Sequence, residues 1–186
     1  MLVRVGLRRS LPSRLFGKSA CQMYLPAPRY FPQPKFDIAQ PNEVHQADLL
    51  FLPHGRVGSK TYKYALTVVD VASRYKEAQA IIDKVATHVA KALQFTYLRS
   101  PLTRPKLLQV NPGSEFRGAV QKLCDKHGTV IPRGVVGGHR DQGMVEGFNL
   151  TLAERLFGCQ YHWELAEPGT RKKDWVLRLP GVTWRP

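Results

Sequence analysis

Hydrophobic and polar positions follow a regular pattern from residue 44 onward. In three segments, hydrophobic and polar residues alternate with a period of two, or the segment becomes apolar on both faces toward one end. Both patterns are typical of strands in a sheet. They are VHQADLLFLP (44–53), YKYALTVVDVAS (62–73) and YKEAQAII (75–82). The basic, polar stretch HGRVGSKT between the first two predicts a hairpin, so these two strands are expected to be antiparallel neighbours.

Helical spacing begins in the next segment, where apolar residues recur every four positions. Residues 85–100 place Val85, Val89, Leu93 and Tyr97 on one face. The later predicted elements are a buried strand at 106–110, a helix at 115–128 capped by Ser114 and Gly128, an edge strand at 129–136 weakened by Pro132, and a helix at 141–157. The order β-β-β-α-β-α-β-α predicts an α/β domain with a mixed five-stranded sheet flanked by helices.

The first 36 residues differ in composition from the rest, so we predict two regions, 1–36 and 37–186. The first region has no acidic residue and seven basic ones that are candidates for nucleic-acid binding: Arg4, Arg8, Arg9, Arg14, Lys18, Arg29 and Lys35. Its composition is typical of a mitochondrial targeting sequence, and a disordered basic arm that binds RNA or DNA is the alternative. Closely spaced prolines predict that the region is extended.

A strong positive charge is the main feature of the composition. The 186 residues contain 28 Lys and Arg against 14 Asp and Glu, which gives a formal net charge of +14. Because phosphate contacts dominate the affinity of cationic surfaces, nucleic acid is the expected partner. Three widely separated cysteines argue against a disulfide framework or a zinc knuckle. No apolar run is long enough to predict a membrane span.

Three polar residues stand where the predicted elements should meet. Asp48 lies within the apolar first strand, Asn111 ends the fourth strand, and Glu146 lies one turn into the last helix. An ionised carboxylate among apolar residues is costly unless it is paired or binds a cation. If the first strand is central and the fourth lies beside it, the three side chains can converge. Three acidic oxygens at such a point would hold two Mg²⁺ or Mn²⁺ ions for phosphodiester chemistry.

Four segments carry a family resemblance: VHQADLLFLP, YALTVVDVASRY, LLQVNPGSEF and HRDQGMVEGFNLTLAERL. In their order and spacing they resemble the catalytic core of retroviral and retrotransposon integrases, over about residues 37–180. The resemblance implies a ribonuclease H-like fold and, in active members, a carboxylate triad that uses Mg²⁺ to nick and join DNA strands. The triad positions fall on Asp48, Asn111 and Glu146. Asp70 matches a frequent family aspartate outside the triad, with an expected structural role.

The chain departs from this family at the second triad position. Asn111 is neutral where the family has the aspartate that shares both metals, so any residual magnesium site would rest on Asp48 and Glu146. A loss of about 3–4 kcal/mol of metal-derived stabilisation would slow the reaction by roughly 10²–10³. The Glu115 side chain would have to reach back across the turn to supply the negative charge that Asn111 lacks. The zinc-binding and DNA-binding modules that flank the core in full-length integrases are not expected here.

These observations favour a catalytically inactive, co-opted integrase core that needs no cofactor. It would be a structural or nucleic-acid-binding subunit, beside other protein subunits, of a mitochondrial assembly such as the mitochondrial ribosome. One alternative is an active or recently decayed retrotransposon integrase, a nuclear enzyme that transfers DNA strands with Mg²⁺. A second alternative is a protein-interaction scaffold in another mitochondrial complex. RNA and DNA both stay open as ligands.

Overall fold

The computed structural model describes residues 40–132, 142–166 and 175–183. The strands are β1 (Val44–Val57), β2 (Lys60–Asp70), β3 (Lys76–Ile81) and β4 (Leu107–Val110). The helices are α2 (Ala86–Arg99), the short 3₁₀ helix η1 (Ser114–Phe116), α3 (Ala119–Lys126), α4 (Gly143–Ala166) and α5 (Trp175–Thr183). The predicted N-terminal region, with its seven basic residues, lies outside the described residues.

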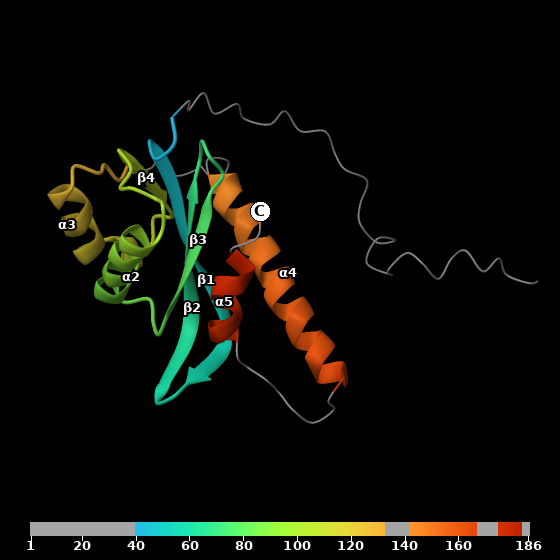
Figure 1. The fold of residues 1–186 in the computed structure, drawn as a ribbon. Helices are drawn as coiled ribbons and strands as arrows, with labels where there is room; N and C mark the ends of the chain where they lie inside the picture. Colours follow the sequence, from blue (N-terminus) through green and yellow to red (C-terminus); the bar gives the residue numbers. More distant parts are fainter. Residues whose placement is uncertain (1–39, 133–141, 167–174, 184–186) are drawn as a thin grey trace, which may run out of the picture. The chain divides into compact units, whose positions relative to one another are not determined.

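The four strands form one mixed sheet in the order β3-β2-β1-β4 (Figure 1). β1 pairs antiparallel with β2, as the predicted hairpin requires, and β2 pairs antiparallel with β3. β4 joins the other side of β1 in parallel, and its last residue, Val110, lies opposite Ala47. This register brings Asn111, the residue after β4, next to Asp48 on β1.

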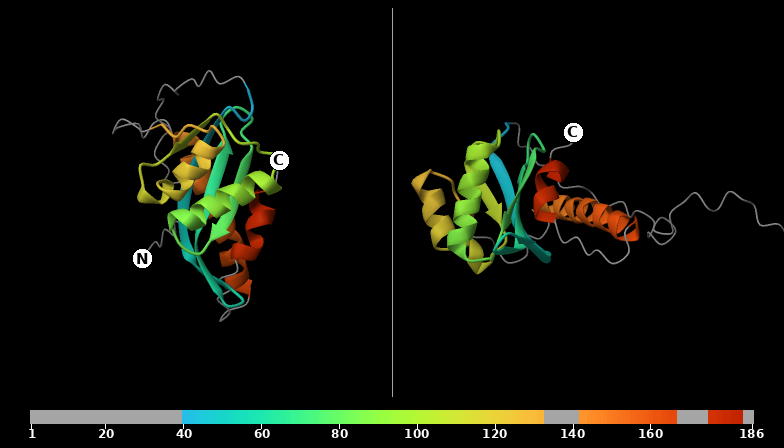
Figure 2. Two further views of the ribbon diagram at one scale, coloured as in Figure 1. Left: turned by 90° about the vertical axis from the view of Figure 1, so that its left-hand side faces the viewer. Right: turned by 60° about the horizontal axis from the view of Figure 1, so that its bottom comes forward.

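Helices cover both faces of the sheet, which gives the described domain three layers (Figure 2). The core between the sheet and the pair α2 and α3 includes Ala47, Leu66, Val68, Val89, Leu93, Leu108, Phe116 and Val120. The core between the sheet and the pair α4 and α5 includes Leu52, Ala65, Val69, Val145, Phe148, Leu152, Leu156 and Trp175. The apolar stripe predicted for the last helix is confirmed, because four of these core residues lie on α4.

The α/β class and the mixed sheet flanked by helices are confirmed, but the sheet has four strands among the described residues, not five. The predicted fifth strand is reduced to one parallel bridge between Val130 and Leu107. Pro132 follows closely and cannot donate a ladder hydrogen bond, which limits further pairing. The rest of that predicted strand, from residue 133, lies outside the described residues.

The helix predicted at 115–128 is broken into η1 and α3. Gly118 lies between them with φ 58° and ψ −101°, a backbone conformation that other residues rarely adopt. Ser114 does not cap the helix as predicted, because Gly113 precedes η1 and no side chain makes a cap hydrogen bond there. Gly128, with φ +70°, follows α3 closely, as predicted.

Two further features of the helices were not expected from the periodicity. Val85 is 53% exposed, because it precedes α2 instead of occupying its buried face. The segment that forms α5 contains Pro180, yet it is helical and buries Trp175 and Leu179. In the described parts of the chain, no helix combines the length and the apolar character that a membrane span requires.

Candidate active site

Asp48 and Asn111 lie in direct contact at the edge between β1 and β4. The Asn111 Nδ2 atom donates a hydrogen bond of 2.9 Å to Asp48 Oδ1. The contact follows from the parallel pairing of the two strands, which ends at Ala47 and Val110, one residue before each of them. The sequence-based expectation that the first and fourth strands bring these two side chains together therefore matches the geometry.

The second oxygen of Asp48 accepts a hydrogen bond from α4. The Asn149 Nδ2 atom donates a hydrogen bond of 2.8 Å to Asp48 Oδ2. The hydroxyl of Thr67 on β2 in turn donates to Asn149 Oδ1 at 2.7 Å. The ionised carboxylate only accepts hydrogen bonds, so the N–H group of the Asn149 amide faces Asp48 and its carbonyl oxygen faces the Thr67 hydroxyl.

The N-terminus of α4 is attached to β1 through the buried side chain of Gln46. The backbone N–H of Val145 donates to Gln46 Oε1 at 3.1 Å, and Gln46 Nε2 donates to Gln109 on β4 at 3.0 Å. A helix start leaves backbone N–H groups without partners inside the helix, and Gln46 satisfies one of them. Glu146 is the residue after Val145, so the contact between Val145 and Gln46 on β1 also determines the position of the Glu146 backbone.

Glu146 is exposed in the first turn of α4, three residues before Asn149. Because α4 packs on the sheet face that the Asp48 side chain occupies, Glu146 and Asp48 lie on the same side of the sheet. The hydrogen bonds that hold Asp48, however, come from the two asparagines. Asp48 and Asn111 are thus in contact and Glu146 lies on the same side of the sheet, while the catalytic roles of all three stay predictions.

The described residues do not fit a two-metal centre. A hard cation such as Mg²⁺ binds oxygen atoms, whereas both oxygens of Asp48 accept hydrogen bonds from amide N–H groups. Within the described ranges, no group of three or more His, Cys, Asp or Glu side chains is arranged to hold a metal ion. The Glu115 carboxylate lies against Gly113.

Asp70 stabilises the turn between β2 and β3. Its carboxylate accepts hydrogen bonds from the backbone N–H groups of Asn42 (3.1 Å) and Ser73 (2.9 Å), and from the Ser73 hydroxyl. Burial alone would raise the pKa of Asp70, but the bonds from Ser73 and Asn42 hold this pKa below its ordinary value. These contacts give Asp70 the structural role that the resemblance implied.

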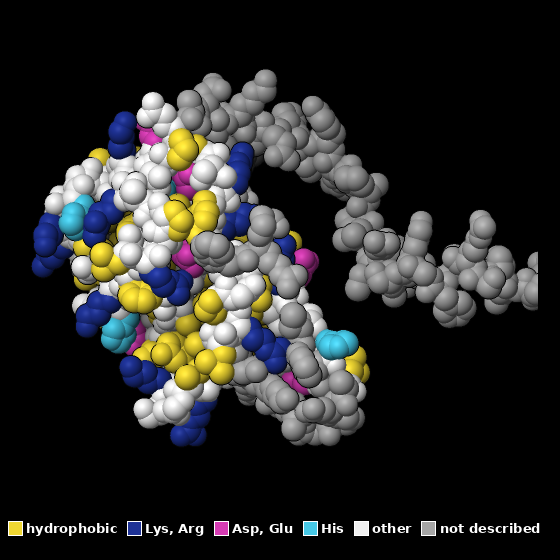
Figure 3. Space-filling view, in the orientation of Figure 1, with side chains coloured by type: hydrophobic (Ala, Val, Ile, Leu, Met, Phe, Trp, Pro, Cys, Tyr) yellow, Lys and Arg dark blue, Asp and Glu magenta, His cyan; other side chains and the backbone are white. Residues whose placement is uncertain are grey.

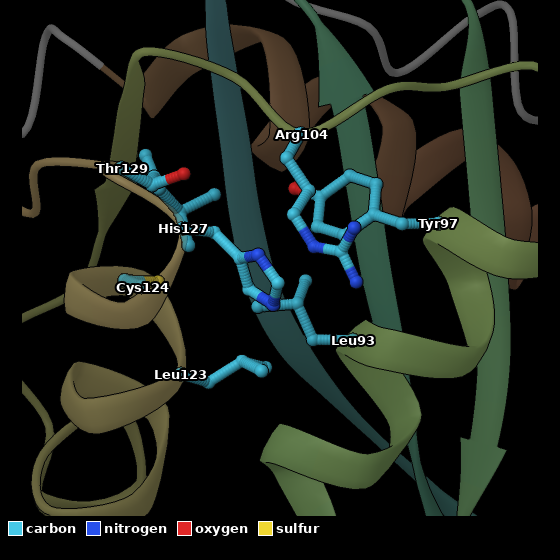
Figure 4. A pocket seen from close by; sticks show the side chains of 8 residues that line it. Leu93, Tyr97, Arg104, Leu123, Cys124, His127 and Thr129 are labelled. Atoms are coloured by element: carbon cyan, nitrogen blue, oxygen red, sulfur yellow. The ribbon is translucent and has the colours of Figure 1, made fainter.

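A small pocket lies on the other face of the sheet, between α2 and α3 (Figure 4). Its volume of about 10 Å³ is enough for one water molecule. The lining includes Cys124, and burial raises the pKa of this thiol to about 11, which makes it a poor nucleophile. The pocket does not contribute to the Asp48 site, which faces α4.

The sequence analysis missed Asn149 on α4 and two residues on strands that organise the site, Thr67 and Gln46. Both are buried polar side chains within apolar strands. A buried polar group needs a hydrogen-bond partner, so their positions carried a signal. The pairing register was required to identify those partners.

Comparison with known proteins shows similarity at the level of structure. No protein-family model and no curated protein matches the sequence. The integrase chain in an intasome of simian T-cell lymphotropic virus, solved in complex with the PP2A regulatory subunit B56 gamma, matches with a TM-score of 0.58 and 19% identity. The chain has the fold of a retroviral integrase catalytic core.

Two further structures support this assignment of the fold. The catalytic core domain of HTLV-2 integrase, in complex with magnesium, matches with a TM-score of 0.53 and 18% identity over 77% of this chain and 84% of that domain. The BIV integrase core matches with a TM-score of 0.52 and 20% identity, over 78% and 86%. The match to the simian virus chain covers 77% of this chain and 48% of that one. The integrase-like core therefore spans about half of that longer viral chain.

Proposed function

We propose that this chain is an integrase-like core that does not catalyse strand transfer and acts as a nucleic-acid-binding or structural subunit of a larger assembly. The observation that carries the proposal is the state of Asp48, whose two carboxylate oxygens are bound by the amides of Asn111 and Asn149. In a metal-dependent nuclease or integrase, a carboxylate at this point would ligate the cations. Here, hydrogen bonds satisfy it without a cation.

The loss of one negative charge at position 111 also argues against catalysis. Two cations must be held at a short, fixed separation to stabilise both the attacking and the leaving oxygen of an in-line displacement. Asp48 and Glu146 supply two carboxylates for this purpose, and Asn111 supplies a neutral amide. The repulsion between two cations is then compensated less well.

Nucleic acid is the proposed partner because of the charge of the chain. The net charge of +14 is spread over both regions, since residues 37–186 still contain 21 basic against 14 acidic residues. Dark-blue Lys and Arg side chains are distributed over the visible face of the described domain (Figure 3). Such a surface attracts phosphate groups without needing a metal centre.

We further propose a mitochondrial location, in an assembly such as the mitochondrial ribosome. The support is the arginine-rich, acid-free composition of residues 1–36. A fusion of these residues to a fluorescent reporter should be imported into mitochondria, and exclusion of the reporter would contradict the location. A protein-interaction scaffold in another mitochondrial complex would share this location but would not bind nucleic acid.

The second candidate function is an active integrase with Mg²⁺ as its cofactor. The retention of Asp48 and Glu146 on the same side of an integrase-like fold favours it. The decisive experiment is a nicking and strand-transfer assay with Mg²⁺ or Mn²⁺ on the full chain, for which we expect no product. Cleavage by the chain with Asn111 intact, abolished by Glu146→Gln, would overturn the non-catalytic proposal and support the integrase.

A further inference from the structure

The hairpin of β1 and β2 continues beyond the rest of the sheet (Figure 1). β4 pairs with β1 only from Val44 to Ala47, and the pairing of β3 with β2 starts at Tyr64. Past these points the described residues form a two-stranded ribbon that ends in the turn at Gly58. A ribbon of this kind exposes side chains that a third strand or a helix would otherwise cover.

One face of this ribbon is closed by α5. The indole N–H of Trp175 donates a hydrogen bond of 2.6 Å to the carbonyl oxygen of Pro53. A Cβ atom on Gly55 would lie 2.7 Å from Trp175 Nε1, so only glycine allows this close packing. The contact fixes the ribbon in place, and a ligand would have to approach the opposite face.

At the base of the ribbon, where β1 pairs with Tyr64, an aromatic side chain is exposed. Phe51 is 61% exposed, although its neighbour Leu52 is only 1% exposed. The Phe51 ring packs edge-on with the rings of Tyr64 and His54, at centroid distances of 5.3 and 6.4 Å. The ring is therefore held in position by its neighbours while much of its surface stays open to solvent. Core packing gives no reason for a large apolar residue at this point.

The part of the hairpin between this aromatic group and the turn is basic. Between residues 49 and 69 the chain contains Arg56, Lys60 and Lys63 and no Asp or Glu. Arg56 and Lys60 are exposed near the turn, where Arg56 Nε donates to the Gly58 carbonyl oxygen at 3.2 Å. The acidic side chain close to Lys63 is Asp83, whose carboxylate already contacts His88 at 2.7 Å. The tip of the hairpin is thus cationic.

We propose that the β1–β2 hairpin binds single-stranded nucleic acid, with Phe51 stacking on an unpaired base and Arg56 and Lys60 contacting the adjacent phosphates. Exposed aromatic rings between basic side chains are the combination that binds single strands, because every base offers a face for stacking. A duplex keeps its base faces covered and is bound less well by such a surface. The proposal rests on the nucleic-acid-binding function proposed above and assigns it a surface.

A protein strand added to the open edge of β1 fits this surface poorly. Pro53 lies in that edge and has no N–H group for a ladder hydrogen bond. The β1–β2 register also shifts between Phe51 and Gly55, which interrupts the regular spacing of backbone groups along β1.

The test measures binding of the full chain to a fluorescein-labelled oligouridine of about 20 nucleotides and to a duplex of the same length, by fluorescence anisotropy. Phe51→Ala should weaken binding to the single strand about tenfold or more, and Phe51→Trp should retain it. The matched control is Phe95→Ala, which removes a 48% exposed aromatic side chain from α2 and should leave binding unchanged. Circular dichroism verifies that each variant is folded.

The charge contribution is tested by salt titration of the same binding. Arg56→Gln and Lys60→Gln should each lower the slope of log affinity against log salt by about one, while Lys122→Gln on α3 should not. In addition, 5-bromouridine in the probe should photocrosslink to the peptide that contains Phe51 and Tyr64.

The outcomes separate this proposal from the proposed function. If the full chain binds no nucleic-acid probe, the nucleic-acid-binding function fails and the hairpin proposal fails with it. If the chain binds but Phe51→Ala behaves like Phe95→Ala, or if crosslinks map only to residues 1–39, the hairpin proposal is overturned while nucleic-acid binding stands. Equal affinity for single strand and duplex would also overturn it.

Discussion

At the scale of single residues, the exchange of a carboxylate oxygen for an amide nitrogen determines the character of the Asp48 site. An aspartate at position 111 would bring two negative carboxylates into contact, which is unfavourable unless a cation lies between them. Asn111 instead donates a hydrogen bond of 2.9 Å to Asp48. With aspartate at position 111, the close approach of the two side chains would require a metal ion between them. With asparagine, the same close approach is stabilised by a hydrogen bond.

The first prediction follows from this exchange. Asn111→Asp should lower the stability of the chain by about 1–3 kcal/mol in EDTA, because a hydrogen bond is replaced by charge repulsion. Mg²⁺ or Mn²⁺ should restore part of the loss by binding the folded state. Thermal unfolding with and without the cation measures both effects.

Asn111→Ala is the matched control, since it removes the hydrogen bond without adding a charge. Its unfolding temperature should not depend on Mg²⁺. If Mg²⁺ stabilises the wild-type chain as strongly as Asn111→Asp, the Asp48 site already binds cations, and our interpretation of the site is wrong.

The second prediction concerns His45, a buried residue whose Nδ1 atom lies 3.2 Å from the Tyr97 hydroxyl. Burial lowers the pKa of His45 from 6.5 to about 4, against the opposing effect of the nearby Asp70 carboxylate. Between pH 4 and pH 6.5, His45 is therefore more often protonated in the unfolded chain than in the folded chain. The stability should therefore fall as the pH decreases from 6.5 toward 4, by about 3 kcal/mol in total.

Urea unfolding at a series of pH values measures this dependence. His45→Gln removes the titrating group, so its stability should vary much less across the same window. Phe95→Ala, which changes no titrating group, provides the control and should keep the wild-type pH dependence. A wild-type stability that is constant between pH 6.5 and 4 would contradict the prediction. The lowered pKa of Asp70 adds a further loss of stability at still lower pH.

At the scale of elements, the break between η1 and α3 depends on one glycine. Gly118 has φ 58° and ψ −101°, and a Cβ atom added there would meet no other atom within 4 Å. The cost of a side chain at this position would thus come from the backbone conformation and not from a clash. The break lets Phe116 and Val120 both reach the core beneath α2.

The third prediction compares two glycine substitutions. Gly118→Ala should destabilise the chain by about 1–3 kcal/mol, because alanine adopts this backbone conformation only with strain. Gly147→Ala on α4 is the control: its Cβ would also meet nothing within 4 Å, but the backbone there is helical. It should stabilise the chain by about 0.5–1 kcal/mol. Chemical denaturation measures both changes in the free energy of unfolding. If both substitutions stabilise the chain, or both destabilise it, the assignment of backbone strain to position 118 is wrong.

At the scale of the whole molecule, the net charge of +14 should determine how binding responds to salt. Contacts to phosphates release counterions, so the affinity of the full chain for RNA or DNA should fall at least about tenfold between 50 and 200 mM salt. Anisotropy titrations at several salt concentrations measure the slope. An affinity that does not change with salt would show that apolar contacts or hydrogen bonds to bases dominate, contrary to this fourth prediction.

The sequence by itself predicted the order of the three antiparallel strands, α2, β4 and α4, but it did not predict α5 and ended β1 and α4 short of Val57 and Ala166. Period-two alternation predicted the three antiparallel strands, and four-residue spacing predicted α2 and α4, because these local periodicities reflect which face of an element is buried. The position of Asp48 within an apolar strand, beside the end of the fourth strand, also followed from the sequence. These features depend on neighbours along the chain.

Only the tertiary structure decided what the candidate site contains. The sequence could place Asp48, Asn111 and Glu146 near one another, but not show that Asn149 and Thr67, from two other elements, complete the hydrogen bonds around Asp48. The reduced fifth strand, the broken helix and the α5 that supports the hairpin likewise depend on packing and register. Such contacts join residues far apart in the chain, so local periodicity carries no information about them.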